Sequence, residues 1–383
     1  MKIVIYCQHV LGVGHFFRTL EIARAMKGAD VILVTGGDQV SALLPDHVRR
    51  VALPGLMMDS TFSTLHCVDP LRNLEDVKLE RQKILLDLMM SENPDFFLVE
   101  LYPFGRRAFE FELIPVLNVI KTRQGMNCKV VCSLRDILVE KKNPSKYETR
   151  VIKALHTWFD AVLVHSDPRL IKLDATFSGM DRIKIPLVYT GFVTPVPDPK
   201  KVRKIREDHG LAQGKRLIIA SAGGGNVGAP LLKAVVHACS EVLSGKNFLL
   251  KTYTGPYMEK QDQDYLKSFE NDRIRVETFT QDFVSLLGAS DLSVSMAGYN
   301  TCMNIVAAKV PALIWPFGQN REQWERAVKI AGFAPITILK DQDLEPLTLA
   351  QRIEAALVTH SPSPGPKLNM DGAANTMKWM RGR

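Results

Sequence analysis

Three turns in this chain have the composition of anion-binding sites, because small residues there stand directly before a helical pattern. The most detailed pattern lies in residues 290–327, where the apolar run DLSVS leads through MAGY into NTCMNIVAAK, whose apolar residues recur at helical spacing. We expect Asn300 or Thr301 to cap this helix, so that its free N–H groups point out of the turn after Gly298. This arrangement favours a ligand that carries phosphate.

A second glycine-rich turn, AGGGNVG, follows the strand pattern RLIIAS and precedes the helical pattern APLLKAVVHACSEVL. Its consecutive glycines, Gly223 to Gly225, leave bare backbone that can approach a diphosphate closely. In an open α/β sheet, ligands bind beyond the carboxyl ends of the strands, where both turns are expected to lie. The second half of the chain is therefore predicted to hold the phosphate-bearing ligand.

Polar residues in the first half also stand at the ends of strand patterns. Glu100 ends DFFLVE, an unusual place for an acid unless it faces a site, so it is a candidate base or a hydrogen-bond partner for substrate. Arg135 and Asp136 stand at the carboxyl end of KVVCSLRDI. Arg135 is expected either to meet a phosphate or sugar carboxylate or to form a salt bridge with Asp136.

The order of elements predicts a doubly wound α/β sheet in each half. KIVIYC, a glycine turn, an amphipathic helix and VILVTGG open the chain, and the second half repeats this plan. Gly12 and Gly14 resemble the start of a dinucleotide fingerprint, but Phe17 stands where its third glycine would be, and no acid closes VILVTGG. A nicotinamide-dependent enzyme is therefore weakly supported.

A length of 383 residues favours two domains over one core. The Pro-rich stretch KIPLVYTGFVTPVPDPKK loses periodicity and is expected to be the linker. No apolar run approaches the roughly 20 residues of a membrane span, and the N-terminus is typical of a first strand rather than a signal peptide. Six scattered cysteines include no CxxC pair, which favours reduced thiols over a structural zinc. A cytoplasmic protein is expected.

The net charge of +8 is concentrated in part between Lys121 and Lys153, where nine Lys or Arg stand against three acids. Such a stretch can meet anionic lipid, nucleic acid or a phosphorylated acceptor, and it can equally be an ordinary solvated surface. Aromatic residues are not interleaved as they are in single-strand binding sites, so no nucleic acid is expected. Peripheral contact with an anionic membrane stays open.

The stretch 290–327 also resembles a known family, the two-domain inverting glycosyltransferases of the GT-B fold, and within them the family 28 group that contains the peptidoglycan GlcNAc transferase. Two positions depart from that family's pattern, which has an acid where Asn304 stands and an Asn where Arg326 stands. The glycine loop also has Asn226 where the family has Ser. The matching positions are Gly298, Thr301, Pro311, Leu313, Pro316, Gln323 and Ala327.

The resemblance implies two Rossmann-like domains that face a central cleft. Residues 1–195 would form the acceptor domain, residues 196–365 the nucleotide-sugar donor domain, and residues 366–383 a terminal helix that crosses back to the first domain. The implied activity is inverting transfer of a sugar from a nucleotide-diphosphate donor, expected to be a UDP-sugar, to an unidentified acceptor hydroxyl. A lipid-linked or phosphorylated acceptor fits. No cofactor and no metal are expected, and no Asp-x-Asp motif stands at a strand end.

The resemblance also assigns roles to individual residues. His15 follows the first glycine turn, where the family has Gly-x-Gly-His, and its neutral imidazole is suited to take a proton from the acceptor. Whether His15 or Glu100 is the base stays open, as does a reading of His15 as a plain helix cap. The acceptor or phosphate side is predicted to include Gly12, Gly14, Arg18 and Arg135. The donor side is predicted to include Gly223, Gly224, Gly225, Asn226, Phe279, Gly298, Tyr299, Asn300, Thr301, Asn304, Gln319 and Gln323.

Two other function classes keep the same fold. A nucleotide-sugar hydrolase or epimerase would consume the donor without an acceptor. A non-catalytic protein that binds a nucleotide sugar would show binding without turnover, and the departures at Asn304 and Asn226 make this alternative worth testing. The sequence does not name the sugar, the base or the acceptor.

Overall fold

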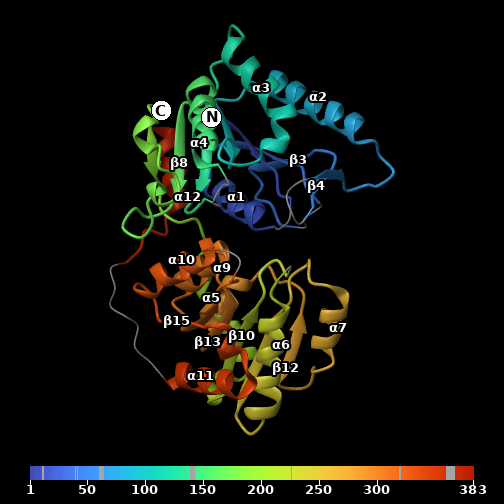
Figure 1. The fold of residues 1–383 in the computed structure, drawn as a ribbon, viewed down its shortest axis with the longest axis vertical. Coiled ribbons are helices and arrows are strands. Elements are labelled where there is room, and N and C mark those ends of the chain that lie inside the picture. The colour runs from blue at the N-terminus through green and yellow to red at the C-terminus, as the bar shows by residue number, and fades with distance from the viewer. Residues whose placement is uncertain are drawn as a thin grey trace. The chain divides into compact units, whose positions relative to one another are not determined.

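The computed structural model describes residues 1–10, 13–38, 40, 42–59, 64–138, 143–225, 227–318, 321–358 and 367–383. The chain forms two compact units, one made of Met1–Val193 with Asn369–Arg383 and the other of Thr194–Leu368 (Figure 1). Among the described residues, no helix combines the length and apolar character that crossing a membrane requires.

The N-terminal unit is built on a seven-stranded parallel sheet with the order β3-β2-β1-β6-β7-β8-β9. Successive residues of its strands alternate between two buried faces, so that Val4 and Tyr6 belong to one apolar cluster and Ile3, Ile5 and Cys7 to the other. The strands are β1 (Lys2–Cys7), β2 (Asp30–Thr35), β3 (Val48–Ala52), β6 (Phe96–Glu100), β7 (Lys129–Arg135), β8 (Ala161–His165) and β9 (Leu187–Tyr189), with a separate hairpin of β4 (Leu56–Met58) and β5 (Leu65–Cys67).

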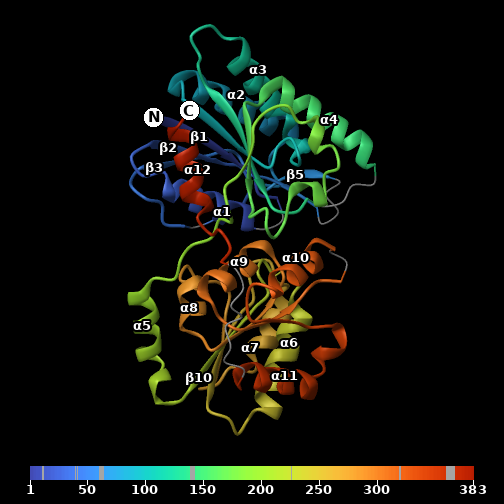
Figure 2. The same cartoon turned by 90° about the vertical axis from the view of Figure 1, so that its left-hand side faces the viewer.

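Helices cover both faces of this sheet. Side chains of α2, α3 and α4 join one cluster, whereas those of α1 and α12 join the other, where the two helices lie side by side (Figure 2). The C-terminal segment thus returns to the first unit, and Val193 bridges Asp371 where the chain leaves the unit and re-enters it. The helices are α1 (Gly14–Ala25), α2 (Leu74–Glu92), α3 (Glu110–Thr122), α4 (Pro144–Trp158) and α12 (Gly372–Arg381).

The second unit repeats the plan with a six-stranded parallel sheet of order β12-β11-β10-β13-β14-β15. Helices α6 and α11 pack on one apolar cluster of this sheet, while α8 contacts both α5 and α9. The strands are β10 (Arg216–Ser221), β11 (Phe248–Tyr253), β12 (Ile274–Glu277), β13 (Leu292–Met296), β14 (Ala312–Trp315) and β15 (Ile336–Ile338). The helices are α5 (Pro199–Asp208), α6 (Ala229–His237), α7 (Lys260–Lys267), α8 (Phe283–Ala289), α9 (Tyr299–Ala308), α10 (Arg321–Ala331) and α11 (Pro346–Val358).

Each sheet has one point at which the strand order reverses, between β1 and β6 in the first unit and between β10 and β13 in the second. Ligands of doubly wound sheets bind in the crevice at the carboxyl ends of these strands. The prediction of an α/β protein with two doubly wound sheets is confirmed. The expected linker is wrong in part, since Leu187–Tyr189 form edge strand β9, which pairs with β8 although its apolar run is only three residues long.

A fully buried arginine fixes the loops around the first reversal point. The side chain of Arg81 on α2 donates to both carboxylate oxygens of Glu112 at 2.6 and 2.8 Å and to Oε1 of Gln8 at 2.8 Å. It also donates to the carbonyls of Gly36 and Pro54, each at 2.7 Å. One guanidinium therefore ties the segments that follow β1, β2 and β3 to helices α2 and α3.

We predict that Arg81→Met lowers the free energy of unfolding of the N-terminal unit by about 3–5 kcal/mol, because it leaves the Glu112 carboxylate buried without its counter-charge. Lys83→Ala on the same helix is the control, since the Lys83 side chain is 76% exposed, and its effect should stay within about 0.5 kcal/mol. Denaturant unfolding of both variants measures the difference. Equal unfolding free energies would contradict the proposed importance of this network.

Candidate active site

The first reversal point brings together His15 and Glu100, which are 85 positions apart in the sequence. Glu100 is the last residue of β6, and His15 is the second residue of α1, which starts beside the end of the neighbouring strand β1. Nδ1 of His15 lies 2.6 Å from Oε1 of Glu100. The Glu100 side chain is completely buried, whereas that of His15 is 22% exposed. Only the imidazole of the pair can therefore be reached by a ligand.

Two arginines flank the Glu100 carboxylate. Arg18, one turn along α1, donates to Oε1 of Glu100, and Nη2 of Arg106 lies 4.0 Å from Oε2. The expected place of Arg18 on the phosphate side is not what the structure shows, because its side chain is 2% exposed and engaged with Glu100. Sequence reasoning assigned no role to Arg106, although it stands in the loop directly after β6.

These charges set the protonation of the pair. Burial opposes ionisation of Glu100, but its contacts with His15, Arg18 and Arg106 outweigh burial and hold its pKa well below the usual range. Burial also lowers the pKa of His15; Glu100 opposes this shift, and the nearby arginines add to it. The pair is thus an ionised carboxylate and a neutral imidazole. Because the carboxylate can only accept, Nδ1 of His15 carries the proton and Nε2 keeps its lone pair.

The remaining first-unit candidates lie around the same edge of the sheet. Gly14 begins α1, and Gly12 lies outside the described residues. Arg135 is the last residue of β7 and is half-buried, while the carboxylate of Asp136 is buried and accepts from the backbone N–H of Ile137 at 2.8 Å. Arg135 stands next to His165 in the β7–β8 register.

In the second unit, the glycine loop after β10 has two residues in the left-handed region, Gly223 with φ +65° and Gly225 with φ +100°. A Cβ on Gly225 would lie 2.7 Å from both the Met258 nitrogen and the Thr254 carbonyl. Gly225 is therefore required by close packing against the loop after β11, a reason that the sequence did not reveal. Gly224 also contacts that loop, since its carbonyl accepts from the Tyr257 N–H at 3.0 Å. Asn226 lies outside the described residues.

The turn after β13 lies across the second reversal point from this loop, since β10 and β13 are neighbouring strands. A Cβ built on Gly223 would lie 3.9 Å from Oγ1 of Thr301, so the two turns face each other. The predicted cap is wrong: Gly298 is the N-cap of α9, and no side chain caps the helix. Asn300 and Thr301 fall inside the first turn instead.

Arg326, which stands where the family pattern has Asn, contacts the turn after β13. Its side chain is completely buried, and Nη1 donates to the Ala297 carbonyl at 3.1 Å. The guanidinium also lies 5.8 Å from the centre of the Tyr299 ring, a cation–π contact that holds this predicted site residue in the protein interior. A buried positive charge thus lies close to the start of α9. The sequence signal for it was the Arg at position 326, where the family pattern has Asn.

The other donor-side candidates that the structure describes lie on α9, on α10 and after β12. Oδ1 of Asn304 accepts from the Thr194 hydroxyl at 2.7 Å, so its one acceptor already has a protein partner. Oε1 of Gln323 accepts from the Phe317 N–H at 3.1 Å and closes the turn after β14. Phe279 follows β12 and is 44% exposed. Gln319 lies outside the described residues.

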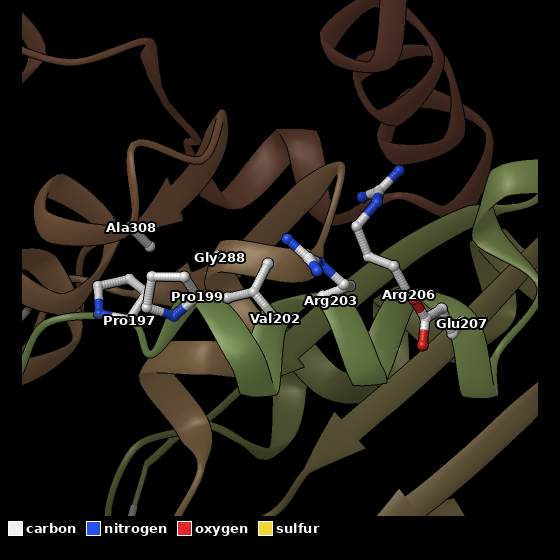
Figure 3. A pocket seen from close by; sticks show the side chains of 8 residues that line it. All are labelled: Pro197, Pro199, Val202, Arg203, Arg206, Glu207, Gly288 and Ala308. Carbon is white, nitrogen blue, oxygen red and sulfur yellow. The ribbon is translucent and has the colours of Figure 1, made fainter.

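A cavity of about 590 Å³ lies elsewhere in the second unit, between α5 and the end of α9 (Figure 3). Its lining surface is mainly apolar and includes Pro197, Val202 and Gly288, together with the charged residues Arg203, Arg206 and Glu207. It also includes Ala308, the last residue of α9, whereas the first turn of this helix lies about 9–14 Å away along the axis. The cavity contains none of the predicted site residues.

Comparison with known families decides the classification of the chain. The model of the glycosyltransferase family 28 C-terminal domain matches residues 221–377, which include both turns of the second unit. The chain resembles family 28 in its second unit and has the GT-B fold. The resemblance inferred from residues 290–327 and from the glycine loop after β10 is thereby confirmed.

Individual relatives agree with this similarity to family 28. A UDP-N-acetylglucosamine--N-acetylmuramyl-(pentapeptide) pyrophosphoryl-undecaprenol N-acetylglucosamine transferase of Methylococcus capsulatus is 25% identical over 158 residues, which are 41% of this chain and 44% of that protein. The matched segment thus spans less than half of the relative. The MurG structure from Acinetobacter baumannii matches all of both chains with a TM-score of 0.54 at 13% identity. A UDP-GlcNAc 2-epimerase from Methanocaldococcus jannaschii does so with 0.58 at 12% identity.

We predict that Gly225→Ala destabilises the second unit by about 1–3 kcal/mol, because a side chain in this left-handed conformation is strained and collides with backbone atoms. Gly245→Ala is the matched control, since a Cβ there meets nothing within 4 Å. Thermal and denaturant unfolding of the two variants provide the comparison. If Gly225→Ala is as stable as the control, the packing account of this loop is wrong.

Proposed function

We propose that the protein is an inverting glycosyltransferase that moves a sugar from a nucleotide-diphosphate donor, a UDP-sugar, to an acceptor hydroxyl. The observation that carries the proposal is the pair of facing turns at the β10–β13 reversal point, which lie within the region that matches family 28. The curated relatives are UDP-N-acetylglucosamine-dependent transferases by name, which supports the choice of nucleotide.

On this proposal, backbone groups of the second unit hold the donor. The N–H groups of Gly223 and Gly225 donate within their own loop, to Oγ of Ser221 and the carbonyl of Ala222, so the diphosphate is bound by the Gly224 N–H and by the first turn of α9. The dipole of α9 adds a partial positive charge there. The buried guanidinium of Arg326 strengthens this field from below the turn. As the sugar departs, charge builds up on the diphosphate, and these fixed donors stabilise it without the need for a metal ion.

The first unit supplies the base. Nε2 of His15 accepts the proton of the acceptor hydroxyl while the acceptor oxygen attacks the anomeric carbon of the donor. Glu100 is too deeply buried to contact the acceptor, so its role is to fix the imidazole tautomer and to stabilise the imidazolium that forms. One base and one displacement invert the configuration at the anomeric carbon.

The acceptor is expected to be lipid-linked or phosphorylated, in line with the pyrophosphoryl-undecaprenol in the names of the curated relatives. The basic stretch Lys121–Lys153 would then attract an anionic membrane. Part of its charge is already paired, since Lys121 contacts Asp160 at 3.0 Å and Arg150 contacts Glu110 at 3.1 Å. Membrane attraction would therefore come from the remaining cations and weaken with salt.

An epimerase is the second candidate, because a UDP-GlcNAc 2-epimerase matches the fold over the whole chain. A nucleotide screen by thermal shift comes first, since a ligand at 100 times its Kd adds about 2.7 kcal/mol. Mass spectrometry of donor-by-acceptor reactions, with water-only controls and with excess chelator, then separates the alternatives. Product that forms only with acceptor and survives chelation supports the proposal; donor conversion in water alone contradicts it.

We predict that His15→Ala lowers turnover by about 100-fold or more, as loss of a general base does, while nucleotide affinity changes little. His66→Ala is the control, because His66 is exposed on the β4–β5 hairpin of the same unit. Steady-state kinetics and calorimetric titration with the nucleotide measure the two effects. Activity close to that of the control would exclude His15 as the base.

We predict that Asn304→Ala weakens nucleotide binding by about 1 kcal/mol, the net contribution of one hydrogen bond. Since Oδ1 of Asn304 accepts from Thr194, the side-chain amide is left to donate to a ribose oxygen. Asn304→Asp should bind more tightly than the wild type, because one carboxylate oxygen can keep Thr194 and the other can accept from a ribose hydroxyl. Calorimetry with UDP decides; identical affinities in all three proteins would mean that the ribose is held elsewhere.

A further inference from the structure

Arg106 stands beside the His15–Glu100 pair but contacts it differently from Arg18. We propose that Arg106 is a positioning residue that acts through Glu100, keeping this carboxylate ionised and the His15 imidazole free of a second proton. The catalytic meaning of this role rests on the proposed function, in which neutral His15 is the base. The electrostatic role itself can be measured without any substrate.

Two features of Arg106 lower the stability of the folded protein. Its backbone is left-handed, with φ +61°, which strains a residue other than glycine by about 1–3 kcal/mol. Its side chain is only 8% exposed, and Nε and Nη2 have no hydrogen-bond partner among the residues that the structure describes. A chain that gained only packing from this position would be more stable with an uncharged residue there.

The guanidinium of Arg106 lies near Oε2 of Glu100, the carboxylate oxygen that His15 and Arg18 do not contact. His15 and Arg18 both contact Oε1 of Glu100, while Oε2 has no hydrogen-bond partner within the described part of the chain. Nη2 of Arg106 lies 4.0 Å from Oε2, beyond hydrogen-bond distance but within strong electrostatic reach. Arg106 therefore stabilises the carboxylate by charge and leaves its orientation toward His15 to the contacts at Oε1.

The ionisable groups around the pair add up to an excess of positive charge. Glu100 supplies one negative charge, against the positive charges of Arg18 on α1 and Arg106 after β6, with Arg135 at the end of β7 close enough to act on Arg106. The other titratable neighbours are uncharged near neutral pH. They are Tyr6 and Cys7 on β1, whose pKa values are raised mainly by burial, Cys132 on β7, likewise raised, and His9 after β1 and His165 on β8, whose pKa values are lowered mainly by burial.

The excess of positive charge determines the direction in which the pKa of His15 shifts. A cation beside the imidazole disfavours its protonated form, so Arg106 lowers the pKa of His15, and removing the charge must raise it. The neutral base is lost as pH falls through this pKa. Without Arg106, the acidic limb of kcat/KM should therefore move to higher pH. Loss of packing could shift the limb the same way by admitting water to His15, but it would then do so in Arg106→Lys as well, which keeps the charge on a shorter side chain.

The test compares Arg106→Gln, Arg106→Gly and Arg106→Lys with Arg107→Gln as the matched control, since the neighbouring Arg107 side chain is 74% exposed. Arg106→Gly removes the charge and suits the left-handed backbone, so it keeps the test valid if the Gln variant does not fold. The His15 imidazole of 15N-histidine-labelled protein is titrated by NMR to the acid limit of the folded state. The buried His165 signals report on intact folding.

We expect the His15 midpoint to rise by about one pH unit or more in the Gln and Gly variants, the usual effect of one close charge, and to stay near the wild-type value in the Lys variant and the control. The acidic limb of kcat/KM should shift in parallel. A midpoint in the Gly variant no higher than in Arg107→Gln would overturn the proposal. If the His15 midpoint rises as expected but the protein has no transferase activity, the proposed function is contradicted and the electrostatic role of Arg106 still stands.

Discussion

The buried carboxylate of Glu100 is the group around which the first unit's site is arranged. Removing an ion from water costs several kcal/mol, and the cost must be offset by partners that are themselves held in place. Helix α1 supplies two of them, His15 and Arg18, from successive turns, and the loop after β6 supplies Arg106. Because the carboxylate stays charged, the imidazole that reaches the surface is held neutral and in one tautomer.

The second unit has a different distribution of charge at its own reversal point, between β10 and β13. There the loops after β10 and β13 present backbone N–H groups and glycines, and the only completely buried cation described beneath them is Arg326. Such a site is suited to bind an anion, whereas the first site is suited to move a proton. The same doubly wound topology thus positions two chemically different sets of groups, because in both units the strand order reverses at the sheet edge where they lie.

Much of the fold could be predicted from the sequence because its signals are local. Apolar runs such as KIVIYC and RLIIAS became buried parallel strands, and the repeated order of elements predicted two sheets. Strand β9 was missed because a three-residue run beside prolines carries little signal. The helix cap predicted at Asn300 or Thr301 was wrong because the N-cap is Gly298, two or three residues earlier than the capping pattern suggested.

The site was predictable residue by residue but not as a set of contacts. Glu100 was singled out by its place at the end of a strand and His15 by its likeness to the family's Gly-x-Gly-His turn, yet their pairing depends on β1 and β6 being neighbours. The same pairing turned Arg18 inward and placed Arg106 beside Glu100. Gly225 was selected for its likeness to phosphate loops, while its packing against Thr254 and Met258 depends on a loop about 30 residues away in sequence.

The central claim is that one neutral base drives a single displacement at the anomeric carbon of a nucleotide sugar. The stereochemistry of the product tests it most directly. Proton NMR of the product formed from an α-linked UDP-sugar and the acceptor found in the screen should show a β-linked glycoside and free UDP. An α-linked glycoside, or free sugar or an epimerised donor formed without acceptor, would contradict the account.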